Sequence, residues 1–368
     1  MAKRCSVLLG LFVVHLRCSS SLLAFGGSRS KYSARLGFVE SAKNRRATLK
    51  QLQATRMPLP GLEFSSPGGE DGILSCQAAV AMGVDDLRVI DVEVGAPGPG
   101  EVRLKVVANA LCHTDIYTLE GSDPEGLFPS ILGHEAGAVV ESVGKGVTSV
   151  VPGDKVVPCY TPQCREAACI FCASPKTNLC PKIRATQGKG VMPDGTTRFR
   201  LANSKEPVHH FMGTSTFSEY TVVAEISCAK VSATANLETV CMLGCGVSTG
   251  WGAVWKTTNV EPSSSVAVFG LGAVGLAVIQ AAKVRGATKI IAIDVNPGKF
   301  AAAEAMGATC TLDPTSLPEG TSVQNALASA PFDMLWGVDY TFDCTGNVAV
   351  MRSALECAHR GCTFVAFR

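Results

Sequence analysis

Ser265-Val-Ala-Val-Phe-Gly-Leu-Gly-Ala-Val-Gly275 is the stretch that decides the fold of this chain. The apolar run Ser265–Phe269 predicts a strand, the glycines follow in a GxGxxG spacing, and a helix is predicted over Leu276–Arg285. A second apolar strand, Lys289–Ile293, ends at Asp294. Strand, glycine turn, helix and then a strand ending in an acid form the dinucleotide-binding fingerprint. A glycine-rich turn in another α/β fold is the alternative, and this context favours the Rossmann reading.

Each residue of this fingerprint has a predicted task. Gly270 permits the tight turn, Gly272 lets the backbone approach a pyrophosphate, and Gly275 lets the helix meet the sheet. The helix N-terminus then faces the phosphates. Asp294 would accept hydrogen bonds from the adenine ribose hydroxyls and repel a 2′-phosphate. The sequence therefore predicts NAD rather than NADP as the cofactor.

The predicted nucleotide domain covers residues 249–368, a doubly wound parallel sheet with helices. Its further elements are predicted as strands over Ala308–Leu312, Val338–Phe342 and Cys362–Phe367 and helices over Val323–Ser329 and Val348–His359. A complete fold of this type has six strands, and only five are predicted here. We therefore expect the Rossmann sheet to be incomplete at the C-terminus.

Residues 73–248 read as a β-rich domain. Short runs of alternating or apolar residues are separated by Gly and Pro, which predicts a barrel-like arrangement with few helices. The predicted strands are Ala78–Ala81, Leu87–Val94, Glu101–Val107, Gly137–Val140 and Gly153–Pro158.

Three candidate metal ligands lie in this domain: Cys112, His134 and Cys245, with Glu135 directly after the imidazole. Two thiolates and one imidazole leave a fourth position on zinc open, as in a catalytic rather than a structural site. Taken singly, such a Cys or His is more often a buried structural residue.

Four of the sixteen cysteines crowd into one lobe, residues 159–182, as Cys164, Cys169, Cys172 and Cys180. Four thiolates close a tetrahedron around zinc, which predicts a structural metal. The lobe has little apolar material, so a metal cross-link would supply its folding energy. A disulfide pair in an oxidising compartment and four unrelated thiols are the alternatives.

Residues 1–72 read as a targeting leader and linker. A positive start is followed by the apolar run Val7–Leu16, the layout of a secretory signal peptide. The segment Gly26–Leu62 is basic with one acid, Glu40, as in a transit peptide. Signal plus transit peptide resembles a bipartite plastid leader; a mitochondrial leader and a misassigned start codon are the alternatives. Pro58–Gly72 is predicted to be a linker.

Length and charge set the remaining bounds. A chain of 368 residues predicts two or three domains, and 46% hydrophobic residues can fill large cores. A net charge of +2 gives no indication of a nucleic-acid or membrane-surface partner, and we expect neither.

From about Leu74 to its end the chain resembles the zinc-dependent medium-chain alcohol dehydrogenases, and more closely their class III, the S-(hydroxymethyl)glutathione dehydrogenases. The Cys2His zinc site of alcohol dehydrogenases is itself the standard example of the pattern above. The stretches that carry the class III resemblance are Cys112–Asp115, Asp123–Gly126, Pro175–Cys180, Lys182–Arg184, Thr186–Gly190, Met192–Thr196, Met212–Tyr220 and Gly244–Gly250. The resemblance implies a GroES-like catalytic domain, NAD and two Zn²⁺ per chain.

The resemblance also implies residue roles. Cys112, His134 and Cys245 would hold the catalytic zinc, with Glu135 beside it, and Thr114 would hydrogen-bond the substrate oxygen. His113 would reach the cofactor phosphates, Thr249 would help position the nicotinamide, and Lys299 would bind ribose near Asp294.

The implied substrate is the glutathione–formaldehyde adduct, oxidised to S-formylglutathione, or S-nitrosoglutathione in reduction. Arg184 would bind a glutathione carboxylate through its forked guanidinium. Arg360 would assist, and Asp123 and Glu125 would meet the glutathione ammonium or restrain loops; for these three a solvated surface charge is the alternative. The family is homodimeric. The other functional hypotheses are a general primary or long-chain alcohol dehydrogenase and an inactive zinc-binding fragment.

Two departures from the family pattern bear on these expectations. Four residues separate Cys164 from Cys169 where the family has two, which makes Cys164 the least secure ligand. The chain also ends before the family's sixth strand and C-terminal return segment, which close the substrate cleft and supply subunit contacts. We expect an incomplete gene model to be the reason.

Overall fold

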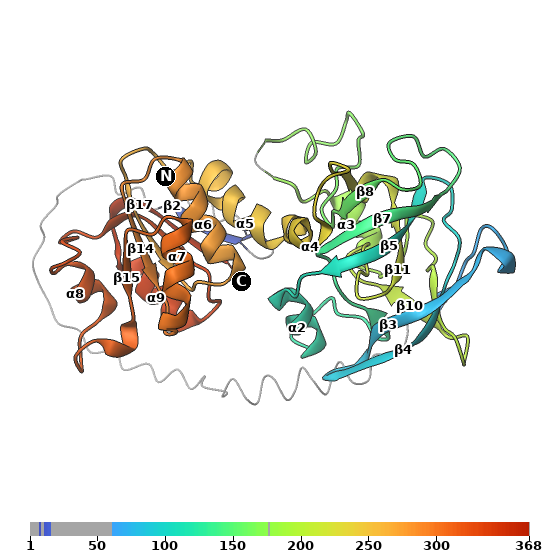
Figure 1. Cartoon of the computed structure of the whole chain (residues 1–368), viewed down its shortest axis with the longest axis horizontal. Helices are drawn as coiled ribbons and strands as arrows, with labels where there is room; N and C mark the ends of the chain where they lie inside the picture. Colours follow the sequence, from blue (N-terminus) through green and yellow to red (C-terminus); the bar gives the residue numbers. More distant parts are fainter. Residues whose placement is uncertain (1–6, 9–10, 16–60, 176, 368) are drawn as a thin grey trace, which may run out of the picture. The chain divides into compact units, whose positions relative to one another are not determined.

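The computed structural model describes residues 7–8, 11–15, 61–175 and 177–367 (Figure 1). These residues form two compact units, one that ends at Cys245 and one that runs from Gly246 and includes the two short N-terminal strands. The division falls slightly before the predicted boundary between Ser248 and Thr249. Among the described residues, no helix is both long and apolar enough to cross a bilayer.

The nucleotide unit is built on one sheet in the order β1-β2-β17-β16-β13-β14-β15. Neighbouring strands from β17 to β15 are parallel. The chain starts in the middle at β13, proceeds to β14 and β15, and then crosses over to β16 and β17, which is doubly wound topology. The strands are β13 (Ser265–Phe269), β14 (Lys289–Ile293), β15 (Cys310–Leu312), β16 (Val338–Asp343) and β17 (Ala358–Phe367). The predicted Rossmann fold is confirmed.

Helices pack on both faces of this sheet, and after their first residues the central strands β13 and β14 are apolar. Val266 and Val268 pack in the same core as the α6 residues Val278 and Ile279. The α-helices are α5 (Gly246–Gly252), α6 (Ala273–Val284), α7 (Phe300–Met306), α8 (Val323–Leu327) and α9 (Val348–Glu356). Shorter helical segments are η4 (Ala253–Thr257), η5 (Pro297–Lys299) and η6 (Pro314–Ser316).

Two differences from prediction concern β17. The helix predicted to reach His359 ends at Glu356, because the chain from Ala358 onward pairs with β16 from Val338. The other edge of β17 pairs antiparallel with β2 (Leu11–His15), which is preceded by β1 (Val7–Leu8). Both of these strands fall within the predicted leader; the rest of that prediction lies outside the described residues.

The second unit is β-rich, as predicted. A closed barrel has the order β10-β6-β3-β4-β9, and a five-stranded sheet has the order β11-β5-β7-β8-β12. The strands are β3 (Leu74–Gly83), β4 (Asp86–Val94), β5 (Glu101–Asn109), β6 (Ser130–Ile131), β7 (Ala136–Val143), β8 (Lys155–Pro158), β9 (Phe199–Leu201), β10 (Pro207–His210), β11 (Tyr220–Ala224) and β12 (Cys228–Lys230). The helices are η1 (Glu70–Gly72), α2 (His113–Leu119), α3 (Pro181–Gln187), η2 (Glu225–Ser227), α4 (Leu237–Val240) and η3 (Cys241–Gly244).

The predicted linker Pro58–Gly72 differs from the structure over its second part. The amide of Ser65 donates to the carbonyl of Thr197 at 2.9 Å, and the amide of Thr197 donates to the carbonyl of Glu63 at 2.8 Å. The guanidinium of Arg200 lies 4.3 Å from the centre of the Phe64 ring. The β-rich unit therefore begins well before Ile73. The glycines and prolines of this segment predict irregular structure. Its backbone pairing could not be predicted locally, because the partner, Thr197, lies far along the chain.

Candidate functional site

The predicted catalytic ligands converge in the β-rich unit. One ligand atom each from Cys112, His134, Glu135 and Cys245 can be chosen so that all lie within 4.8 Å of one another. His134 and Glu135 are buried, and the two cysteines are half-buried. Glu135 therefore contributes an atom to the cluster, whereas the sequence-based expectation placed it only beside the zinc. Residues more than 100 positions apart in the sequence meet at one point, as the zinc prediction required.

Asp115 organises two of these ligands. Cys112 is the N-cap of α2, and its amide donates to Oδ2 of Asp115 at 3.3 Å. Oδ1 of Asp115 accepts the amide of Gly133 at 3.0 Å and lies 3.1 Å from Nδ1 of His134. This carboxylate is 4% exposed. One buried side chain therefore ties the loop before α2 to the loop that carries His134.

His134 presents its other ring nitrogen to the thiols. Nε2 is buried and has no hydrogen-bond partner among the described residues. Burial would lower the pKa of the imidazole, but the Asp115 carboxylate and the Cys112 sulfur raise it to about 10. The same negative groups would stabilise a cation bound at Nε2. A metal ligand needs such a free, oriented nitrogen.

The two thiols are strongly coupled. Hydrogen bonding to Cys245 holds the pKa of the Cys112 thiol well below its usual value, while the negative Cys112 sulfur raises the pKa of Cys245. The hydroxyl of Tyr160 lies 3.5 Å from Sγ of Cys245, and burial raises the pKa of this phenol. A divalent cation would relieve the repulsion between two adjacent thiolates, so this donor set fits zinc.

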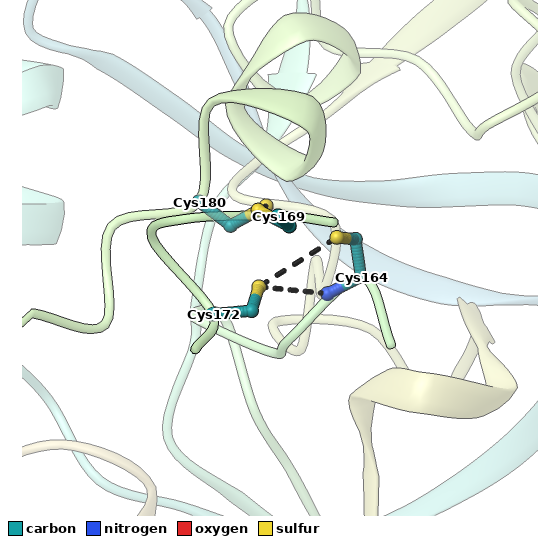
Figure 2. A group of neighbouring side chains, drawn as sticks. All are labelled: Cys164, Cys169, Cys172 and Cys180. Carbon is teal, nitrogen blue, oxygen red and sulfur yellow. Dashed lines mark hydrogen bonds between the residues drawn. The ribbon is translucent and has the colours of Figure 1, made fainter. Parts of the chain in front are cut away.

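The four predicted structural cysteines also form one cluster, which the structure places in the lobe before α3 (Figure 2). Their ligand atoms lie within 4.8 Å of one another. The sulfurs of Cys164 and Cys172 are 3.6 Å apart, and those of Cys169 and Cys180 are 3.9 Å apart. Four sulfurs at the usual Zn–S bond length are separated by about 3.8 Å in a tetrahedron. The spacing fits one zinc ion and is far too long for a disulfide.

The longer gap after Cys164 does not exclude that residue from the cluster. Arg165 takes up the turn with a φ of 58°, and the amide of Cys169 donates to the carbonyl of Glu166 at 3.0 Å. The Glu166 carboxylate pairs with Lys182 on α3. The two additional residues are therefore absorbed in a compact turn that returns the chain to the metal cluster.

The fingerprint glycines lie where the sequence predicts. Gly270 has a φ of 90°, and a Cβ there would lie 2.7 Å from Cγ2 of Thr345. A Cβ on Gly275 would collide with the carbonyl oxygen of Gly270, so the helix could not approach the strand. A Cβ on Gly272 would meet no atom within 4 Å. Open space in front of Gly272, at the N-cap of α6, suits a bound pyrophosphate.

Asp294 and Lys299 lie together beside this turn. Asp294 Oδ2 accepts the amide of Leu271 at 2.7 Å and is 2.9 Å from Nζ of Lys299, and Oδ1 accepts the amide of Asn296 at 2.9 Å. Burial would raise the pKa of this carboxyl, but the Leu271 amide and Lys299 hold it below its usual range. Asp294 is therefore a fixed negative charge at the carboxyl end of β14.

Three further predicted residues lie on helices. Thr114 is on α2, with its hydroxyl 3.5 Å from Sγ of Cys112, and His113 is exposed at the start of the same helix. Thr249 lies on α5 in the nucleotide unit.

Two of the predicted substrate residues bind each other. The guanidinium of Arg184 on α3 pairs with the carboxylate of Glu125. Asp123 accepts from the Thr118 hydroxyl and the Glu125 amide, both at 2.9 Å, so it shapes this loop. Arg360 lies at the amino end of β17, away from the Gly270 turn at the carboxyl ends of the strands, and its side chain is outside the described part. Its predicted substrate role gains no support from this position.

The roles of Asp115 and Tyr160 were not predicted from the sequence. Asp115 was visible three residues after Cys112, the position of a capping-box acid, which is a local signal for a helix start. Its second contact, to His134, depends on the fold. Tyr160 carries no local signal, because its partner Cys245 is 85 residues away.

Family models match both units. Residues 98–233 match the alcohol dehydrogenase GroES-like domain, and residues 273–367 match the zinc-binding dehydrogenase domain. Among solved structures, an alcohol dehydrogenase zinc-binding domain protein from Burkholderia ambifaria superposes with a TM-score of 0.70 at 35% identity, covering 78% of this chain and 75% of that one.

Curated relatives give a finer assignment. The alcohol dehydrogenase class-3 of Dictyostelium discoideum is 55% identical over 79% of this chain and 76% of the relative. The S-(hydroxymethyl)glutathione dehydrogenase of a Synechocystis species is 54% identical over 78% of this chain and 76% of the relative. The chain therefore belongs to the zinc-binding alcohol dehydrogenases and, within them, to class III.

Proposed function

We propose that this protein oxidises S-(hydroxymethyl)glutathione to S-formylglutathione with NAD as hydride acceptor. The observation that carries the proposal is the convergence of Cys112, His134 and Cys245 in a chain of class III sequence. A bound zinc would act there as a Lewis acid toward the substrate oxygen. The same site, run in the other direction with NADH, would account for S-nitrosoglutathione reduction.

The chain's own residues would hold and orient the reacting groups. Asp115 would keep the His134 ring turned so that Nε2 faces the thiols, and so fixes the tautomer that can bind a metal. The Thr114 hydroxyl, next to Cys112, is the group proposed to accept the alcohol proton and pass it outward. The cofactor itself carries the hydride, and the Gly270 turn and Asp294 would hold its phosphates and adenosine ribose.

We assign the selectivity for the glutathione adduct to Arg184 on α3. Glutathione has two carboxylates, and the forked guanidinium of Arg184 matches a carboxylate in two parallel hydrogen bonds. Arg184 already pairs with one carboxylate, that of Glu125, which supports a carboxylate-binding role for its guanidinium. A hydrogen bond between charged groups contributes about 1.5–3 kcal/mol, roughly a factor of 10 to 100 in kcat/KM.

The test compares two substrates in the Arg184→Ala variant. NADH formation would be measured with glutathione plus formaldehyde and, separately, with a long-chain primary alcohol. We expect kcat/KM for the adduct to fall about 10- to 100-fold, while turnover of the alcohol stays near that of the unmodified protein. Arg88→Ala, which breaks an exposed pair with Asp86 on β4, is the matched control. Equal losses on both substrates would favour a general alcohol dehydrogenase, and no NADH from the unmodified protein would favour a zinc-binding fragment.

A further inference from the structure

The three proposed zinc ligands are restrained by different neighbours. Asp115 contacts both the loop of Cys112 and the ring of His134. Cys245 lies between two glycines, after η3 and before α5, with φ −146° and ψ −74°. Its backbone is outside both helical segments, and flanking glycines leave a chain conformationally free. The direction of its Sγ therefore depends on what the side chain itself contacts.

Tyr160 is held in place next to this sulfur. Nε2 of Gln187 donates to the carbonyl of Tyr160 and to that of Met212, both at 2.9 Å, which anchors the backbone just after β8. The Tyr160 ring stands edge-on to the His134 ring, with centroids 5.1 Å apart and an interplanar angle of 79°. Both restraints act on the ring and backbone, so the hydroxyl has a fixed position, 3.5 Å from Sγ of Cys245.

We propose that Tyr160 is a positioning residue of the metal centre, whose hydroxyl donates a hydrogen bond to Sγ of Cys245 and so orients this ligand and weakens its electron donation to zinc. The proposal rests on the zinc site proposed above. A cysteine that binds zinc is a thiolate and can only accept, so the phenol must be the donor. Hydrogen bonds to ligand atoms orient the ligands and tune the metal.

A purely structural role would not need the hydroxyl. The edge-on contact with His134 is made by the aromatic ring, and a phenylalanine would preserve it. Burying a hydroxyl costs free energy unless the hydroxyl makes a hydrogen bond. For the half-buried Tyr160 hydroxyl, the sulfur of Cys245 is within hydrogen-bond distance. The ring therefore accounts for packing and the hydroxyl for the contact with the ligand.

The experiment uses the full chain with cobalt in place of zinc. The energy of the thiolate-to-cobalt charge-transfer band is higher when the electrons on the sulfur are more strongly stabilised. In Tyr160→Phe, loss of the hydrogen bond should move the band of the Cys112–Cys245 site to longer wavelength. Because the sulfur is then no longer held toward the metal, a chelator should also remove metal from this site more readily, with an affinity lower on the order of tenfold. Tyr220→Phe, which removes a phenol from β11 in the same unit, should match the unmodified protein.

The possible results separate the two proposals. A Tyr160→Phe protein with the spectrum and the metal release of the unmodified protein would overturn the role of Tyr160 and leave the zinc site standing. An unmodified protein that takes up cobalt only at the four-cysteine cluster would overturn both. General unfolding of Tyr160→Phe, with metal lost from both clusters and a lower melting temperature, would also refute the positioning role, because the hydroxyl would then be supporting the fold.

Discussion

Oδ1 of Asp115 lies 3.1 Å from Nδ1 of His134 and accepts the amide of Gly133 as well. A buried carboxylate at this position fixes one imidazole nitrogen so that the other faces the two thiols. Asp115→Asn keeps the shape but removes the charge. We expect the metal at this site to bind about 10- to 100-fold more weakly, the usual cost of losing the partner of a metal-binding histidine.

Chelator competition on purified protein would measure this affinity. The metal bound by the four-cysteine cluster would serve as the internal reference. Asp313→Asn, which removes a helix-capping carboxylate from η6 of the nucleotide unit, should change neither site. Unaltered affinity in Asp115→Asn would mean that the carboxylate supports only the start of α2.

The four-cysteine lobe should depend on its metal for stability. Cys172→Ser removes one thiolate from the tetrahedron, so zinc content should fall from two ions per chain to one and the lobe should unfold locally. Metal analysis together with limited proteolysis would detect both effects. Cys159→Ser, a nearby thiol outside the cluster, is the control and should retain two ions. Retention of both ions by Cys172→Ser would contradict a four-thiolate site.

Glu125 should compete with the substrate for Arg184. An exposed ion pair of this kind contributes up to about 1 kcal/mol, equivalent to roughly a fivefold change in binding. Glu125→Gln leaves the guanidinium without its partner, so KM for the glutathione adduct should fall by up to about fivefold while kcat stays the same. Steady-state kinetics with the adduct and with a long-chain alcohol would show whether the change is confined to the adduct. A higher KM would instead make Glu125 a direct contact of the substrate ammonium.

Asp294 should set the choice between NAD and NADP. Its carboxylate would repel a 2′-phosphate, and it neutralises Lys299, which could otherwise bind one. Asp294→Ser should weaken NAD binding and strengthen NADP binding, which titration of each cofactor against the protein would quantify. Asp313→Asn serves as the control here too. An unchanged ratio of the two affinities would show that other residues make the discrimination.

Acid should destabilise the β-rich unit through His209 and His210. Both side chains are buried, and burial holds the pKa of His209 below its usual value and lowers that of His210 to about 3. Above about pH 6.5 the two histidines are neutral whether the chain is folded or not. As pH falls below that value, only the unfolded chain takes up the protons, so stability is lost by up to about 1.4 kcal/mol per pH unit for each histidine.

His209→Phe tests this pH dependence. The His209 ring lies against the backbone of Lys189 and Gly190, and phenylalanine keeps a ring there while removing the titrating nitrogens. Urea midpoints at several pH values should fall less steeply between pH 6.5 and 5 in the variant than in the unmodified protein. Parallel curves would show that the unfolding of this unit in acid is governed by other groups, such as the thiolates.

Prediction from sequence succeeded where the signal is local. The Gly270 turn, the helix after it and Asp294 follow one another within a short stretch, and each has a sterically or electrostatically required residue type. Both metal clusters were predicted because Cys thiolates and His imidazoles are the side chains that typically bind zinc.

The missed features all depend on distant partners. The second contact of Asp115 joins it to His134, Tyr160 meets Cys245, and Arg184 pairs with Glu125, which precedes it by 59 residues. Phe64 and Ser65 were assigned to a linker because their pairing with the strand region around Thr197 has no trace in their own sequence. Residue type indicates what a side chain can bind, and only the fold determines which partner is within reach.

Cys245 is the last residue of the β-rich unit and also the last member of either cysteine cluster along the chain. During synthesis, a nascent chain that has emerged from the ribosome as far as Cys245 already carries every sulfur and nitrogen of both clusters. Domains generally fold in the order in which they are made. Both metal clusters can therefore form before translation of the nucleotide unit is complete, so zinc capture does not require a finished cofactor-binding fold.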